Sequence, residues 1–235
     1  YSANDLYIFV SSYLMPRKTL YVHLEREVMH LLDHSPSNTN MLLHSYYHKN
    51  NELSMDHVFP EDKYEDDILY VPNTPHVAVY IMYRKGLKLN NKNKCLLMGY
   101  GAYGVEFARE YKSNNGGAMY YTSLMDRGFV VALAFIRGGS FGGFKFHDEG
   151  RMKHRQNVYD DFIKVAKYLI HEKITESSRL AIYGRSAGGL LIGNVINMEP
   201  ELCNLAILGV PFVMPYNVMI DCLLYTSPSP RDTLL

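Results

Sequence analysis

Residues 184–188 constrain this 235-residue chain more than any other segment, because they place Ser186 between glycines in the pattern G-x-S-x-G. The apolar run 180–183 precedes the pattern, and residues 188–198, which have an apolar face, follow it. These flanks predict a strand that turns sharply into a helix at the serine. Glycine on both sides lets chain segments approach where a Cβ atom would clash. The same turn places the backbone N–H of Ala187 at a helix N-terminus, which favours negative charge.

A strand–turn–helix of this kind is typical of the nucleophile elbow of α/β-hydrolases. Ser186 is therefore the candidate nucleophile, and the Ala187 N–H is a candidate oxyanion donor. The five-residue pattern alone also fits a Gly/Ser-rich turn without chemistry. The flanking strand, the flanking helix and a third glycine, Gly189, favour the elbow, because a glycine there allows the helix to pack closely on the strand.

Strands and helices alternate in the rest of this region, which predicts a mainly parallel sheet with helices on both faces. The expected strands are residues 68–71, 77–83, 95–98, 129–136, 179–183 and 206–210, and the expected helices are residues 117–126, 158–171 and 188–198. The strand at 129–136 is apolar throughout, as in a sheet covered on both sides. The fold class is α/β, and we interpret it as a partial α/β-hydrolase fold.

A glycine-tyrosine loop, residues 99–104, follows the expected strand at 95–98. In α/β-hydrolases the second oxyanion donor comes from the loop after an early strand. We expect the hydroxyl of Tyr100, ahead of that of Tyr103, to be this donor; the alternative is a turn with two packed tyrosines. The glycine-rich segment 136–143 follows the next strand at the same sheet edge, but it lacks the Lys-Ser/Thr of a phosphate-binding loop.

Composition argues against several classes of protein. The 24 Lys and Arg residues balance the 24 Asp and Glu residues, and no basic run suggests a nucleic-acid partner. No apolar run is long enough to predict a membrane span or a signal peptide. The three cysteines, Cys95, Cys203 and Cys222, lack metal-ligand spacing. We therefore expect a reduced, cytoplasmic protein without cofactor or metal, either a monomer or a small homo-oligomer.

The order of these motifs resembles the catalytic domain of the prolyl oligopeptidase family of serine peptidases. That order is Gly99-Tyr100-Gly101, Arg137-Gly138-Gly139, Asn157-x-x-x-Asp161-Phe162 and then Gly184-x-Ser186-x-Gly188-Gly189. Ser-Ala-Gly-Gly and the segment 210–213 look most like the oligopeptidase B branch. Residues 6–32 are similar to the last blade of that family's β-propeller. The resemblance covers residues 6–32 and 68–221.

The resemblance implies a serine-type peptidase that cleaves short peptides, after Lys or Arg in the oligopeptidase B branch. Ser186 would form the acyl-enzyme, and Tyr100 and the Ala187 N–H would form the oxyanion hole. The family's Asp and His follow the nucleophile, but no histidine follows Ser186 in this chain. His147 and His154 precede it, and we expect them to be packing or surface residues.

We divide the chain into four parts. Residues 1–32 are interpreted as a last-blade remnant of a β-propeller, 33–67 as a turn-rich linker or insertion, and 68–221 as a partial α/β-hydrolase catalytic domain. Residues 222–235 look like a translated sequencing adapter rather than a native tail, the alternative being a genuine Pro/Ser-rich tail. On this interpretation the chain is a fragment that is itself inactive. Alternatives are an esterase or lipase on the same fold, which would lack propeller strands, and a non-catalytic binding homologue.

Overall fold

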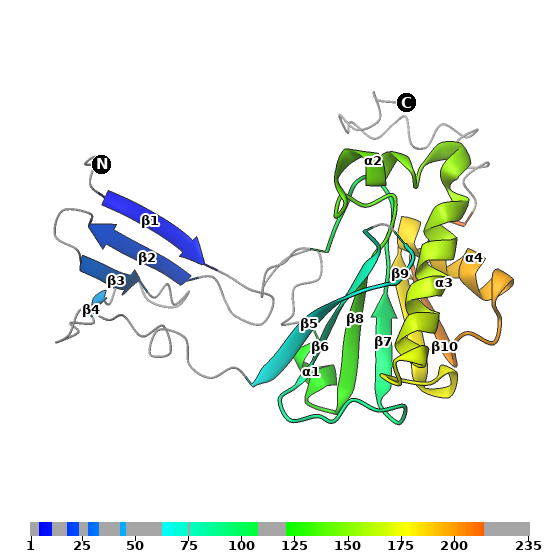
Figure 1. Ribbon diagram of the computed structural model, residues 1–235, viewed down its shortest axis with the longest axis horizontal. Helices are drawn as coiled ribbons and strands as arrows, with labels where there is room; N and C mark the ends of the chain where they lie inside the picture. Colours follow the sequence, from blue (N-terminus) through cyan, green and yellow to red (C-terminus); the bar gives the residue numbers. More distant parts are fainter. Residues whose placement is uncertain are drawn as a thin grey trace. The chain divides into compact units, whose positions relative to one another are not determined.

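The computed structural model describes residues 5–10, 18–23, 28–32, 43–45, 63–74, 76–107 and 121–213. These residues form two sheets, one of four strands and one of six, each of which is considered by itself (Figure 1). The predicted tail at 222–235 and the predicted helical residues 117–120 lie outside the described residues.

The four-stranded sheet is an antiparallel meander in which the strands are neighbours in chain order. Its strands are β1 (Asp5–Val10), β2 (Lys18–His23), β3 (Val28–Leu32) and β4 (Leu43–Ser45). The strand-forming runs at 6–12 and 19–24 predict the first pair, but the sequence predicted neither β3 nor β4. The prediction of a loop was wrong for β4, because a strand of three residues is too short for an alternating pattern to emerge from its polar surroundings.

The six-stranded sheet has the strand order β10-β9-β7-β8-β6-β5. Its strands are β5 (Tyr64–Tyr70), β6 (Ala78–Arg84), β7 (Lys94–Met98), β8 (Phe129–Phe135), β9 (Leu180–Arg185) and β10 (Leu205–Gly209). β9 pairs in parallel with both β7 and β10. Strand β8, whose last six residues are all buried, lies inside the sheet, as its apolar sequence predicted.

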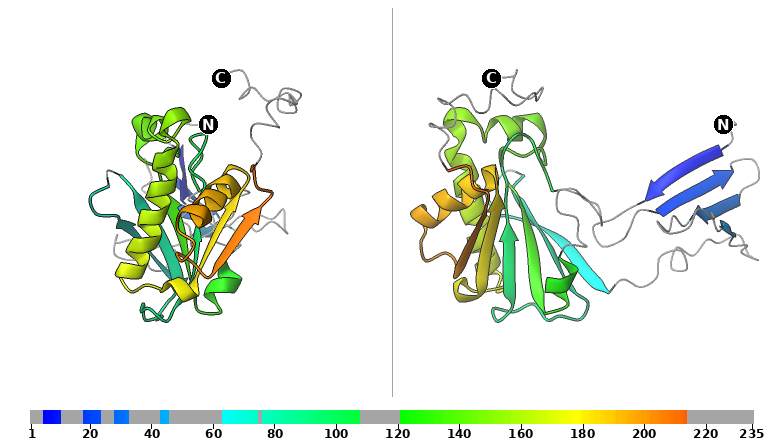
Figure 2. Two further views of the ribbon diagram at one scale, coloured as in Figure 1. Left: turned by 90° about the vertical axis from the view of Figure 1, so that its right-hand side faces the viewer. Right: turned by 180° about the vertical axis from the view of Figure 1, so that it is seen from behind.

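Two long helices, α3 (Gln156–His171) and α4 (Ala187–Met198), lie beside one another on one face of this sheet (Figures 1 and 2). The apolar residues of 158–171 recur at helical spacing in the sequence, which predicts that they share one face. The buried stripe of α3 contains these five residues: Val158, Phe162, Val165, Ala166 and Leu169. Removing each large apolar side chain from water contributes about 1.5–3 kcal/mol. The sheet with its connecting helices confirms the α/β-hydrolase class of fold, and within the described residues the long helices cover one face.

The remaining helices are short. They are α1 (Thr122–Met125), α2 (Gly143–Asp148) and the single 3-10 turns η3 (Met152–His154) and η4 (Ser177–Arg179). Sequence analysis did not predict α2, because a helix of six residues that begins at a glycine shows little helical periodicity in its sequence. None of the helices in the described part of the chain is long and apolar enough to cross a membrane.

Candidate active site

Ser186 lies at the junction between β9 and α4, where the chain turns with φ 56° and ψ −116°. A residue other than glycine at such a positive φ costs about 1–3 kcal/mol, so the surroundings must hold it in place. The Ser186 N–H donates to the carbonyl of Gly209 at 2.9 Å. The Ser186 carbonyl accepts from the N–H groups of Gly189 at 2.9 Å and of Phe212 at 3.1 Å. The side chain is exposed, so the predicted strand–turn–helix presents its hydroxyl to solvent.

The glycines around Ser186 are required by close contacts. A Cβ atom at Gly184 would overlap the carbonyl of Gly188. One at Gly188 would lie 2.6 Å from the carbonyl oxygen of Gly99, and one at Gly189 would lie 2.6 Å from Cα of Pro211. Real Cβ atoms do not approach other heavy atoms so closely, which explains in physical terms why the elbow has glycine at all three positions.

The loop after β7 brings Tyr100 to the start of α4. The Gly99 N–H extends the β7–β9 ladder by donating to the carbonyl of Tyr183 at 3.1 Å. A Cβ atom at Gly188 would lie 3.4 Å from Cδ2 of Tyr100, so the tyrosine ring lies against the first turn of α4. Tyr103, the other candidate, has φ 56° and is 66% exposed. This placement is compatible with Tyr100 as the oxyanion donor, as the sequence order suggested.

A buried ion pair joins the end of β8 to α3 beside this loop. Arg137 donates from Nε to Oδ2 of Asp161 at 2.7 Å and from Nη2 to Oδ1 at 2.6 Å. The Arg137 N–H also donates to Oδ2, at 3.2 Å, and Asp161 is fully buried. Hydrogen bonding to Asp161 raises the pKa of Arg137. Sequence analysis placed both residues in motifs but did not pair them, because 24 positions separate them.

Replacing Asp161 with alanine should destabilise the folded protein by about 3–5 kcal/mol, because Arg137 would lose the partner of a half-buried charge. The measurement is urea denaturation of the full-length protein. Asp160→Ala is the matched control, since the hydrogen bond that Asp160 accepts from Gln156, at 2.9 Å, is exposed. We expect that control to change the free energy of unfolding by less than about 1 kcal/mol. Equal losses in the two variants would contradict the assigned role of the buried pair.

The two histidines considered from the sequence have other surroundings. Nδ1 of His147 lies 2.9 Å from the carbonyl oxygen of Gly138, and the His147 and Phe144 rings form a T-shaped contact with centroids 6.5 Å apart. His154 is exposed in η3. These positions agree with a packing and a surface role. Among the described residues no side chain hydrogen-bonds to the Ser186 hydroxyl, and the predicted site residues that the structure brings together there are Ser186, Ala187 and Tyr100.

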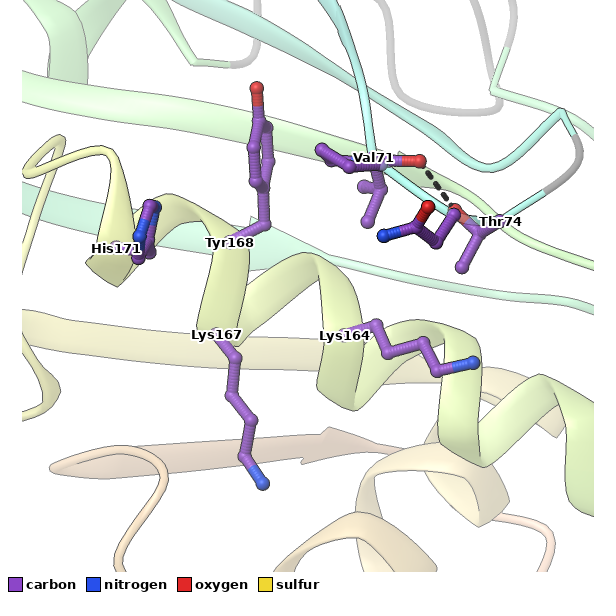
Figure 3. Close-up of a pocket in the computed structure, with 8 residues that line it drawn as sticks. Val71, Thr74, Lys164, Lys167, Tyr168 and His171 are labelled. Atoms are coloured by element: carbon purple, nitrogen blue, oxygen red, sulfur yellow. Dashed lines mark hydrogen bonds between the residues drawn. The ribbon is translucent and has the colours of Figure 1, made fainter.

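A pocket of about 400 Å³ lies between α3 and the turn that joins β5 to β6 (Figure 3). The Thr74 hydroxyl donates to the carbonyl of Val71 at 2.6 Å on one side of it. On the other side the ammonium of Lys167 extends away from Thr74 and pairs with Glu199 at 2.6 Å. No residue of the elbow or of the Tyr100 loop lines this pocket. We therefore do not assign it to the active site.

The sheet with its parallel strands β7, β9 and β10, the strained serine between β9 and α4 and the tyrosine loop after β7 have the arrangement of an α/β-hydrolase fold. Residues 118–229 match the model of the prolyl oligopeptidase family. The hydrolase part of this chain is therefore similar to that family over these residues. The match ends within residues 222–235, and the non-native origin of that tail stays a prediction.

Individual relatives agree with this similarity. Dipeptidyl aminopeptidase BI of Pseudoxanthomonas mexicana is 36% identical over 69% of this chain and 22% of the relative. Protease 2 of Moraxella lacunata is 36% identical over 63% of this chain and 20% of the relative. Oligopeptidase B from Leishmania major has a TM-score of 0.65 at 28% identity, over 94% of this chain and 27% of that structure. The chain thus spans about a fifth of the length of these curated relatives.

Proposed function

We propose that the full-length protein is a serine peptidase that cleaves short peptides through an acyl-enzyme on Ser186. The observation that carries this proposal is the backbone of Ser186, which is held at φ 56° with its side chain exposed at the start of α4. A strained, exposed serine at a helix N-terminus suits a nucleophile, because the oxyanion formed by its attack lies close to backbone N–H groups.

Two groups would stabilise that oxyanion. The Ala187 N–H belongs to the first turn of α4, where the helix dipole favours negative charge. The Tyr100 hydroxyl would donate from the other side, since its ring lies against the same turn. In the proposed reaction Ser186 Oγ bonds to the peptide carbonyl carbon and its proton passes to a general base. The family resemblance implies that this base is a histidine that follows the nucleophile in the chain.

The oligopeptidase B branch resemblance leads us to propose cleavage after Lys or Arg. The full-length protein should hydrolyse a short fluorogenic peptide with Arg or Lys before the scissile bond with a kcat/KM at least about 10-fold above that of the matched Ala or Pro peptide. An acidic group of the enzyme that pairs with the Lys or Arg side chain would supply selectivity of this order. The measurement is a kcat/KM series on four peptides that differ only at this residue.

Two other results of the same assay would lead to different conclusions. Preference for the Pro peptide would support the proposed peptidase activity and contradict the proposed oligopeptidase B specificity. Hydrolysis of the matched esters without hydrolysis of any peptide would replace the peptidase with an esterase on the same fold. A full-length protein that hydrolyses neither class of substrate and does not react with a fluorophosphonate would be a non-catalytic homologue.

A further inference from the structure

The two residues that flank Tyr100 in the chain, Gly99 and Gly101, both pack closely against α3. A Cβ atom at Gly99 would lie 2.5 Å from the ring of Phe162. Gly101 is buried with φ +60°, and a Cβ atom there would overlap the side chain of Val158. Phe162 and Val158 are both on the buried stripe of α3. The position of the tyrosine therefore depends on how the first half of this helix meets the loop.

Arg155, the residue that precedes α3, makes the polar contact at this junction. Its Nη1 donates to the carbonyl oxygen of Gly101 at 2.5 Å, across 54 positions of sequence. The guanidinium also lies 5.7 Å from the centre of the Tyr159 ring. Its Nη2 is buried and has no hydrogen-bond partner among the described residues. Within the described residues, the side chain of this half-buried cation thus hydrogen-bonds to the Tyr100 loop.

The opposite side of the same loop is held by the segment after β8. Gly138 has φ +89°, and a Cβ atom there would overlap the carbonyl of Gly101. The Gly138 carbonyl accepts from the Gly104 N–H at 2.9 Å. Gly138 follows Arg137, which the buried Asp161 of α3 holds by two side-chain hydrogen bonds. The Gly101 peptide is therefore confined between Gly138 and the guanidinium of Arg155.

We propose that Arg155 is a positioning residue that fixes the Gly101 peptide and so keeps the Tyr100 hydroxyl in the oxyanion hole. This proposal rests on the proposed function, because it assigns Arg155 a role through Tyr100. Without the guanidinium, the carbonyl of Gly101 loses its side-chain donor and the peptide can rotate. A displacement of about 1 Å in a catalytic group can cost up to 10²-fold in rate.

The experiment replaces Arg155 in the full-length protein with Met, which keeps an apolar stem of similar length, and with Lys, which keeps a cationic donor. Arg155→Met should lower kcat by about 10-fold and change KM by less than about 2-fold, because the oxyanion contact forms mainly in the transition state. Arg155→Lys should restore most of the rate. Arg151→Met is the matched control, since Arg151 is 54% exposed and pairs with Asp148 instead. We expect that variant to retain the wild-type kcat.

Combining Arg155→Met with Tyr100→Phe separates positioning from general stability. If Arg155 acts through Tyr100, adding Arg155→Met to Tyr100→Phe should lower kcat by less than about 2-fold, whereas any loss in melting temperature should persist. A double variant whose kcat falls by the product of the two single effects would overturn the positioning role. A wild-type kcat for Arg155→Met beside an impaired Tyr100→Phe would overturn it too, while leaving the proposed function intact. A wild-type kcat for Tyr100→Phe alone would instead remove the oxyanion assignment and this inference with it.

Discussion

Replacing Ser186 with alanine should abolish covalent labelling of the full-length protein by a fluorophosphonate probe and reduce peptide turnover to background. The expected loss in kcat is on the order of 10⁶-fold, the scale for removing a nucleophilic serine. The physical reason is that the Ser186 Oγ lies at the strained junction of β9 and α4. Labelling is read by in-gel fluorescence, and the adduct of the wild-type protein is located by mass spectrometry.

Ser140→Ala is the matched control for this experiment. Ser140 is also an exposed serine, but it follows β8, which β7 separates from β9 in the sheet, so its loss should leave labelling unchanged. Ser186→Gly tests whether the loss reflects unfolding. Glycine tolerates φ 56°, so the free energy of unfolding of this variant should equal that of the wild type or exceed it by up to about 1 kcal/mol. The variant should nevertheless remain unlabelled. Persistent labelling of Ser186→Ala would place the nucleophile elsewhere.

The elbow could be predicted from the sequence because each of its requirements is local. An apolar run, a serine between glycines and an apolar-faced segment occupy consecutive positions, and the structure places β9, Ser186 and α4 there. The stripe of α3 was predictable for the same reason, since its period lies within one helix. Short elements lacked such a pattern, which is why α2 and β4 were not predicted.

The surroundings of the site could not be predicted, because they join distant positions. Nothing in the segment that contains Arg155 indicates a hydrogen bond to Gly101, which is 54 positions away. The pairing of Arg137 with Asp161 likewise depends on how β8 and α3 are packed rather than on either motif. The choice of Tyr100 over Tyr103 rested on position in the loop and on the family resemblance. The structure adds the contact of the Tyr100 ring with the first turn of α4.

Replacing Tyr100 with phenylalanine should lower kcat of the full-length protein by on the order of 10²-fold, the scale for one lost oxyanion donor. The substitution removes one hydroxyl and keeps the ring that lies against α4, so packing at Gly188 should be preserved. KM should change much less, because the hydrogen bond strengthens as negative charge develops on the carbonyl oxygen. The measurement is steady-state hydrolysis of the peptide that the wild-type protein cleaves best.

Tyr103→Phe is the control that makes the Tyr100 result specific, since it makes the same substitution three positions further along the same loop. Tyr103 is 66% exposed, and we expect its replacement to change kcat by less than about 2-fold. Fluorophosphonate labelling offers a second comparison, because formation of the adduct also places negative charge on an oxygen in the hole. Labelling should therefore slow in Tyr100→Phe and not in Tyr103→Phe. A rise in KM without a change in kcat, or an equal loss of kcat in both variants, would show that Tyr100 binds or packs without stabilising the oxyanion. The Ala187 N–H would then be left as the assigned donor.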